Sequence, residues 1–209
     1  ADFVALGFDL AFKYNNPAII LADGIIGQMM EKVVLPPFRP RRTEEEIRKQ
    51  MPWATQGKLA GHKRNVITSL ELDPAIMEEN NIRFQAKYRK IEEAEVRYEE
   101  IGCENADYLM IAFGSMARIC LKTQEMALAE GIKVGVLRPI TLWPFPSKII
   151  AEYANKVKGM ISVELNAGQM VEDIRLAVNG KVKVEHFGRL GGIVPTPDEV
   201  LNALKQKLM

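Results

Sequence analysis

The sequence has few of the residues that build metal centres or disulfide frameworks. Its 209 residues include only two cysteines, Cys103 and Cys120, and two histidines, His62 and His186. Neither cysteine lies in a Cys-x-x-Cys or Cys/His cluster, so we expect free thiols and no zinc or iron–sulfur site within this chain. A histidine triad or histidine metal site is a poor hypothesis, and we expect His186 to be a packed or surface residue.

An excess of charge of one sign and long apolar runs are also lacking. Lys and Arg total 28 against 27 Asp and Glu, which gives a formal net charge of +1. This balance excludes a broad electrostatic attraction to nucleic acid or anionic lipid. No apolar run approaches the length of a membrane span, and no signal-peptide pattern is present. We predict a soluble, cytoplasmic protein without nucleic-acid or membrane partners, whose 47% apolar residues suffice for a buried core.

The first 34 residues predict a helix, a strand and a second helix. Apolar residues recur at helical spacing at the start, and the N-N-P triplet at 15–17 stops that helix. The apolar run 17–23 is typical of a buried strand, and 25–33 continues as a helix. One strand cannot form a sheet alone. Because the chain also opens without an initiator Met, we interpret 1–34 as the truncated end of a larger α/β domain.

Residues 35–104 predict a connector followed by one long helix. Prolines and glycines interrupt 35–73 so often that only a short helix is expected there. Connectors of this length are either wrapped over a partner or plain interdomain linkers, and both interpretations stay open. In 75–101, apolar residues fall on three- and four-residue steps, so we predict a surface helix with one buried stripe.

The remainder, 105–209, predicts an α/β domain with a mainly parallel, doubly wound sheet. Short apolar runs alternate with segments of helical periodicity, which is the pattern of right-handed crossovers between parallel strands. A binding crevice is expected at the carboxyl ends of such strands. The expected strands are 108–113, 133–137, 160–164 and 182–185, and the expected helices are 115–130, 147–157, 169–178 and 196–208.

A glycine turn follows the first of these strands. Gly114 opens the turn, and Ser115 is placed to cap the helix that comes next. Free N–H groups beside a helix N-terminus can hold phosphate or carboxylate. A dinucleotide fingerprint would need three correctly spaced glycines, which are lacking, so simple capping is the favoured interpretation.

A rigid aromatic loop follows the second strand. Three prolines in L-R-P-I-T-L-W-P-F-P, at 137–146, fix an extended path that presents Trp143 and Phe145. This aromatic pair is suited either to anchoring another protein surface or to plugging its own domain. Arg138 suits an anionic ligand, an interface carboxylate or local carbonyl groups.

Polar residues and glycines also gather after the third and fourth strands. Glu164, Asn166, Gly168 and Gln169 stand where the third strand turns into a helix, and either a domain interface or helix capping would use them. No second titratable residue stands nearby in sequence, which argues against Glu164 as a general acid or base. Arg189 is the ligand-type residue of the last loop. We assign no catalytic and no metal-ligating residue to this chain.

Four motifs resemble the α-type subunits of 2-oxoacid:ferredoxin oxidoreductases. They are F-D-L-A-F-K-Y-N-N-P-A-I-I-L-A-D-G at 8–24, the aromatic loop at 137–146, E-L-N-A-G-Q-M-V-E-D-I-R-L-A-V at 164–178, and G-R-L-G-G with P-T-P-D-E-V at 188–200. The resemblance covers almost the whole chain. G-H-K-R-N-V-I-T-S-L, at 61–70, is most similar to the 2-oxoisovalerate branch, and the 2-oxoglutarate branch comes next.

The resemblance implies a fold and a set of partners. It implies that 105–209 is a transketolase C-terminal-like domain, that 35–104 connects it, and that 1–34 ends a pyrimidine-binding domain whose activating glutamate lies upstream. Thiamine diphosphate, Mg²⁺ and [4Fe-4S] clusters are then expected in the complete complex and not in this chain alone. The implied partners are β, γ and ferredoxin-like δ subunits, with ferredoxin and coenzyme A acting on the whole complex.

Three functional classes remain open at this point. The first is a structural part of an enzyme that converts a 2-oxoacid to acyl-CoA and reduces ferredoxin, with the isolated chain inactive. The second is a freestanding Rossmann-like module for a nucleotide or coenzyme A, which depends on Gly114, Ser115 and Arg138. The third is a pure assembly module anchored by Trp143 and Phe145. The family motifs favour the first class.

Overall fold

The computed structural model describes residues 1–209 except 56, 58–60 and 62, so His62 and its place in the motif at 61–70 lie outside the described residues. The described chain forms two compact units. The N-terminal unit comprises Ala1–Ile20 and Glu31–Lys87, and the sheet unit comprises Leu21–Met30 and Tyr88–Met209.

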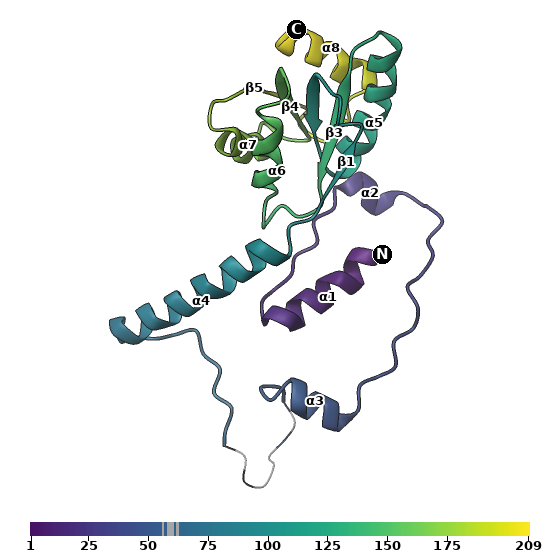
Figure 1. The fold of residues 1–209 in the computed structure, drawn as a ribbon. Helices are drawn as coiled ribbons and strands as arrows, with labels where there is room; N and C mark the ends of the chain where they lie inside the picture. The colour runs from purple at the N-terminus through teal and green to yellow at the C-terminus, as the bar shows by residue number, and fades with distance from the viewer. Residues whose placement is uncertain (56, 58–60, 62) are drawn as a thin grey trace. The chain divides into compact units, whose positions relative to one another are not determined.

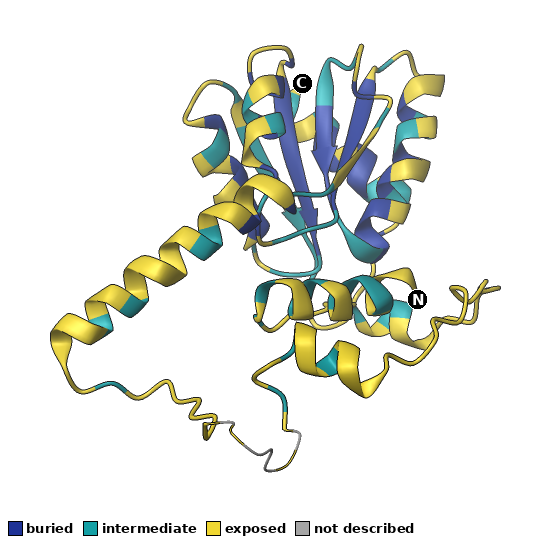
Figure 2. Ribbon diagram, turned by 60° about the horizontal axis from the view of Figure 1, so that its bottom comes forward, coloured by how far each residue is buried: buried dark blue, intermediate teal, exposed yellow. Residues whose placement is uncertain are grey.

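The N-terminal unit is helical and mostly exposed. Its helices are α1 (Asp2–Tyr14), α3 (Glu44–Gln50) and the larger part of α4 (Pro74–Ala94). The predicted first helix is confirmed, and it ends at Asn15, whose left-handed backbone (φ 45°) closes the last turn. A capping box of Thr43 and Glu46 starts α3. Figure 2 shows how little of this unit is buried, so packing contributes little to its helices.

Two predictions for the early chain are wrong. Residues 17–23 contain no strand, and the helix that follows is only α2 (Gly24–Gln28) instead of 25–33. The apolar run at 17–20 is exposed and has no strand beside it to accept its backbone hydrogen bonds. Without such a neighbour, an apolar run does not become a strand.

The sheet unit contains five strands in the order β1-β3-β2-β4-β5 (Figure 1). The pairs β2–β3, β2–β4 and β4–β5 are parallel, and only β1–β3 is antiparallel. The predicted mainly parallel α/β sheet is therefore confirmed, and the four expected strands agree with the observed bounds to within three residues. The strands are β1 (Tyr98–Ile101), β2 (Tyr108–Ile111), β3 (Val134–Pro139), β4 (Gly159–Glu164) and β5 (Lys183–Gly188).

Helices cover both faces of the sheet. Helices α5 (Gly114–Ala129) and α8 (Pro197–Leu208) lie on one face, and α6 (Ser147–Tyr153) and α7 (Met170–Val178) lie on the other (Figure 1). Two buried apolar clusters fill the two interfaces, one around Met110 and Leu204, the other around Leu109 and Ile174. Because β2 and β4 are buried on both sides, they carry continuous apolar runs instead of an alternating pattern.

The strand β1 corrects the prediction of one helix over 75–101. The helix α4 ends at Ala94, and the chain then turns to pair antiparallel with β3, with Tyr98 opposite Pro139. Its middle residues Glu99 and Glu100 are exposed, as expected for a charged strand at a sheet edge.

None of the helices in the described part of the chain is both long enough and apolar enough to cross a membrane.

Candidate functional site

The carboxyl ends of β2 and β4 mark the place where a parallel sheet usually binds its ligand. These strands are neighbours, but β2 leads through α5 to β3 on one side, whereas β4 leads through α7 to β5 on the other side. The two helices therefore leave towards opposite faces of the sheet, which opens a crevice between their N-termini in folds of this kind. The candidate site residues after β2 and β4 lie at this edge.

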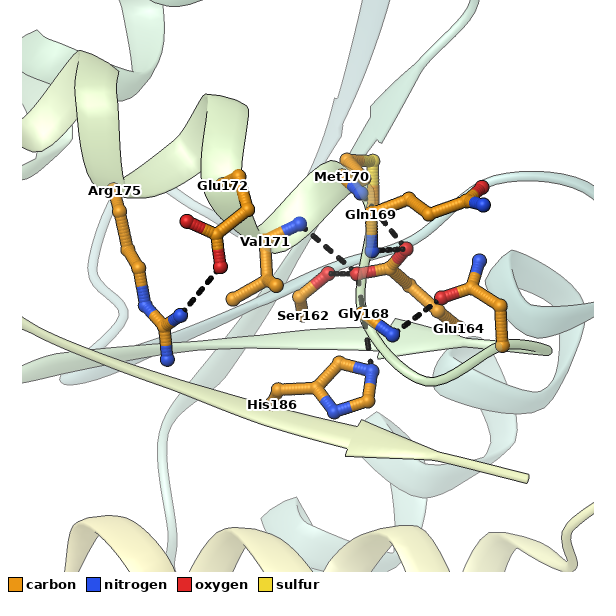
Figure 3. A network of polar contacts seen from close by, with 10 residues as sticks. Ser162, Glu164, Gly168, Gln169, Met170, Val171, Glu172, Arg175 and His186 are labelled. Carbon is orange, nitrogen blue, oxygen red and sulfur yellow. Dashed lines mark hydrogen bonds and ion pairs between the residues drawn. The ribbon is translucent and has the colours of Figure 1, made fainter. Parts of the chain in front are cut away.

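Glu164 closes the N-terminus of α7. Its carboxylate accepts hydrogen bonds from the main-chain N–H groups of Gln169 (3.1 Å), Met170 (2.9 Å) and Val171 (3.0 Å) (Figure 3). The hydroxyl of Ser162 donates a fourth bond, at 2.7 Å. Glu164 is only 2% exposed and Ser162 is fully buried. One buried carboxylate thus satisfies three of the main-chain donors that the start of a helix leaves open.

The hydrogen bonds keep Glu164 ionised. Burial opposes ionisation and would raise the pKa of this carboxyl, but the bonds from Ser162, Met170 and Gln169 outweigh burial and hold the pKa below its ordinary value. The positive end of the α7 dipole acts in the same direction. A carboxylate with four hydrogen-bond donors around it and a lowered pKa is held as an acceptor in this turn.

The turn between Glu164 and α7 is held by close packing. Gly168 has φ 111°, and its N–H donates to Asn166 Oδ1 at 2.7 Å, so Asn166 fixes the turn and does not cap the helix. A Cβ atom at Gly188 would lie 2.1 Å from the carbonyl oxygen of Asn166, so only glycine fits on the neighbouring strand. His186 lies beside this turn, with Nε2 buried, without a hydrogen-bond partner, and 3.9 Å from Glu164 Oε1.

The end of β2 is closed by a second carboxylate. Gly114 adopts φ 60°, and the N-cap position of α5 is Phe113, which has no side-chain capping bond. Asp23 supplies the acceptor instead: Ser115 N–H donates to its Oδ2 and Ser115 Oγ donates to its Oδ1, both at 2.9 Å. Ser115 therefore does not cap α5, which corrects that prediction. The same Asp23 caps α2 by accepting from Ile26 N–H at 2.9 Å.

The two arginines predicted as ligand contacts have carboxylate partners within the sheet unit. Arg138 Nη1 lies 2.7 Å from Glu99 on the neighbouring strand β1. Arg189 Nη1 lies 3.4 Å from Glu199 in the first turn of α8. Both pairs are partly exposed, so they contribute modestly to stability. They stand at separate places and do not converge on one anion.

The aromatic loop divides into one buried and one exposed ring. Phe145 is half-buried against the apolar cluster on the α6 and α7 face of the sheet. Trp143 is 52% exposed and makes an edge-to-face contact with Tyr88, with ring centroids 5.7 Å apart. The sequence left open whether this aromatic pair packs into its own domain or contacts another protein. In the structure, Phe145 packs into its own domain, and Trp143 is exposed to a neighbouring surface.

The described residues do not fit an iron–sulfur cluster or a metal ion, two of the groups that the family resemblance implies. Cys103 and Cys120 are free, are buried, and belong to the apolar clusters on opposite faces of the sheet. Burial raises the pKa of the Cys103 thiol to about 11 and also raises that of Cys120, whereas iron–sulfur clusters need thiolates. Across the described ranges, no three His, Cys, Asp or Glu residues are grouped to hold a metal ion.

The chain resembles known proteins over nearly its whole length. Residues 106–200 match the family described as pyruvate:ferredoxin oxidoreductase core domain II. The ketoisovalerate oxidoreductase subunit VorB of Methanothermobacter thermautotrophicus is 43% identical over 205 residues, which cover 98% of this chain and 56% of that subunit. The chain is a homologue of 2-oxoacid:ferredoxin oxidoreductase subunits. The resemblance drawn from the four sequence motifs is thereby confirmed.

Two further similarities, to a curated subunit and to a solved structure, point to the same group of enzymes. The 2-oxoglutarate synthase subunit KorA of Methanothermobacter marburgensis is 28% identical over 229 residues, which cover 97% of this chain and 60% of that subunit. The solved 2-oxoglutarate:ferredoxin oxidoreductase from Magnetococcus marinus superposes with a TM-score of 0.58 and 26% identity, over 66% of this chain and 24% of that one. The chain spans little more than half the length of the curated relatives it matches.

Three residues at the carboxyl edge of the sheet were not predicted as site residues. Asp23 had been assigned to the end of a strand, and 91 positions separate it from Gly114. Ser162 is one residue of an otherwise apolar run, and the sequence indicates a packed or surface role for His186. A lone Ser in a buried strand, two positions before a Glu, was the available signal: both side chains point to the same face, and a buried hydroxyl needs a partner.

Proposed function

We propose that this chain is a structural part of a 2-oxoacid:ferredoxin oxidoreductase that acts on 2-oxoisovalerate. The proposed enzyme oxidatively decarboxylates its 2-oxoacid, forms the acyl-CoA and reduces ferredoxin. The observation that carries the proposal is the 43% identity with VorB over 98% of this chain. That identity is well above the 28% to KorA, so the 2-oxoisovalerate branch is favoured over the 2-oxoglutarate branch.

In this proposal the reactive groups belong to other parts of the complex. Thiamine diphosphate with Mg²⁺ and the [4Fe-4S] clusters would be held by the remaining polypeptide and by the β, γ and ferredoxin-like δ subunits. Two facts support this division: the two thiols lie on opposite faces of the sheet, and the carboxylates at the sheet edge are engaged by the protein's own donors. The free thiols also favour a cytoplasmic location.

The contribution of the chain is then a rigid surface at the carboxyl edge of the sheet. Glu164, Asn166 and Gly168 fix the turn after β4, and the prolines at 139–146 fix the loop that exposes Trp143. Exposed aromatic side chains on preorganised loops are typical anchors of protein interfaces. Trp143, Arg138 and Arg189 are our candidates for direct contacts with partner subunits, and the buried Glu164 positions the turn beside them.

The test is turnover by the complete complex. We expect the purified complex that contains this chain to reduce ferredoxin with 2-oxoisovalerate and coenzyme A, with a higher kcat/KM than with 2-oxoglutarate or pyruvate. The isolated chain should show no turnover under the same conditions. A complex that oxidises none of the three acids would contradict the proposed activity, and a preference for 2-oxoglutarate would contradict the branch assignment.

The alternative of a freestanding nucleotide- or CoA-binding module has less support. It depends on Gly114, Ser115 and Arg138, yet the Ser115 donors are taken by Asp23 and Arg138 is paired with Glu99. Titration calorimetry with NAD(P)H and coenzyme A separates the two functions. We expect no binding tighter than about millimolar, which corresponds to roughly 4 kcal/mol.

A further inference from the structure

Asp23 links two parts of the sheet unit that are far apart in sequence. The segment Leu21–Met30 belongs to this unit, although the chain leaves it for the N-terminal unit and returns only at Tyr88. The carboxylate of Asp23 caps α2 in its own segment, and it also accepts two bonds from Ser115, 92 positions later. The two segments also approach each other at Gly114, where an added Cβ atom would lie 3.8 Å from Ile26 Cδ1.

We propose that Asp23 is an internal ligand that locks α2 onto the N-terminus of α5, so that the starts of the two helices are held together and released together. Oδ1 is shared by Ile26 N–H and Ser115 Oγ, and Oδ2 takes Ser115 N–H. The first turn of each helix therefore depends on the same side chain.

The three hydrogen bonds at position 23 require a carboxylate on a side chain of this length. Asparagine would replace one acceptor oxygen by an NH₂ group and set it against a donor of Ser115 or Ile26. The N-cap residue of α5, Phe113, makes no side-chain capping bond of its own. Gly114 is matched to the lock, since a Cβ atom there would lie 2.8 Å from Asp23 Oδ2 and its φ of 60° disfavours other residues.

The lock has a consequence for assembly, which rests on the proposed function. It holds α2 at the carboxyl edge of the sheet, beside the end of β2, where we place the contacts with partner subunits. Asp23 is then a positioning residue of that interface. The isolated chain is sufficient to test the lock, so its failure is distinguishable from a failure of the proposed enzyme activity.

The experiment is hydrogen exchange of the full chain at constant pH, with Asp23→Asn, Ser115→Ala and the matched control Asp9→Asn. Asp9 is a carboxylate of the N-terminal unit that pairs with Arg39 on an exposed surface. Asp23→Asn should speed exchange at least about tenfold both at 24–28 and at 114–117, because each start loses charge-assisted bonds. Asp9→Asn should change neither segment.

Ser115→Ala keeps the main-chain donor and removes only the hydroxyl. It should speed exchange at 24–28 by roughly threefold, although the substitution lies outside that segment. This effect reports the coupling of the two helix starts even where Asp23→Asn unfolds the unit. Unchanged exchange in both segments of Asp23→Asn would overturn the proposal. A change confined to 24–28 in Asp23→Asn would overturn it as well, because α5 would then be independent of the carboxylate.

Discussion

Replacing Glu164 by glutamine should destabilise the sheet unit far more than the change of one atom suggests. The carboxylate of Glu164 accepts from three main-chain N–H groups and from Ser162. Glutamine keeps one oxygen for two of these donors and presents an NH₂ group to the others. The hydroxyl of Ser162 can rotate and accept from that NH₂ group. At least one N–H at the start of α7 is then left facing a donor.

The expected cost follows from these contacts. A buried N–H without an acceptor costs about 1 to 3 kcal/mol. The bonds that remain change from charged to neutral acceptors and lose roughly half of their strength. Burying a neutral amide is easier than burying a carboxylate, which offsets part of the loss. We expect Glu164→Gln to lower the free energy of unfolding by about 2 to 4 kcal/mol, against a total of about 5 to 15 kcal/mol for a domain.

The assay is native-state hydrogen exchange of the amides in β4 and α7, which reports the sheet unit separately from the N-terminal unit. Glu172→Gln is the matched control, because Glu172 lies in the first turn of the same helix but is exposed and pairs with the exposed Arg175. Exposed pairs contribute little, so this control should change the free energy by less than about 0.5 kcal/mol.

The pH dependence gives a second test with a definite sign. The pKa of Glu164 is lowered in the folded protein, so its ionisation stabilises the fold above the ordinary value of 4.5 and that stabilisation is lost as the pH falls through the lowered pKa. Glutamine does not titrate. The difference in stability between the wild type and Glu164→Gln should therefore be constant near neutral pH and shrink below about pH 4.5. A difference that grows towards acid, or equal stabilities at pH 7, would refute the reasoning.

Three further predictions address the thiols, the packing and the interface. Cys103 and Cys120 should not react with a thiol reagent at pH 8 in the native chain and should both react after unfolding, because both are buried and burial raises their pKa values; rapid native labelling of either would contradict this. Gly188→Ala should lower the free energy of unfolding of the sheet unit by about 3 kcal/mol, because its Cβ atom would lie 2.1 Å from a main-chain carbonyl oxygen, whereas Gly27→Ala has open space and should be nearly neutral in the same exchange assay. Trp143→Ala should weaken association with the partner subunits by about 2 kcal/mol, roughly 30-fold in Kd, measured by calorimetry or sedimentation, and an unchanged Kd would remove this ring from the interface.

The parallel core of the sheet was predictable because its information is local. The strands β2, β3 and β4 are short, mostly apolar runs, and glycines or prolines at the turns separate them from helices of clear periodicity. The helix expected at 196–208 is observed as α8, and a capping box of Thr196 and Glu199, two residues three positions apart, forms its start. These features depend on residues a few positions apart, so a single sequence contains them.

The errors occurred where a partner distant in sequence decides the structure. The run at 17–23 has a strand-like composition, but no strand lies beside it. In the segment Tyr98–Ile101, the apolar residues continue the helical spacing of the preceding helix, and two glutamates lie between them. Pairing with β3 nevertheless makes this segment a strand. Ser115 was expected to cap its own helix, and the acceptor came from Asp23, 92 positions earlier. Pairings over such separations are not encoded in local periodicity.

At this edge of the sheet, the protein's own carboxylates accept from donors at the starts of two helices. In related folds, the point between two strands whose crossovers leave in opposite directions binds a phosphate or carboxylate at a helix N-terminus. Here β2 and β4 form that point, Asp23 occupies donors at the start of α5, and Glu164 occupies those at the start of α7. The donors at these two helix starts therefore stabilise the fold itself. What the edge offers a neighbour is shape, because the proline-rich loop exposes Trp143, and this is the form of recognition that we propose for the contacts with partner subunits.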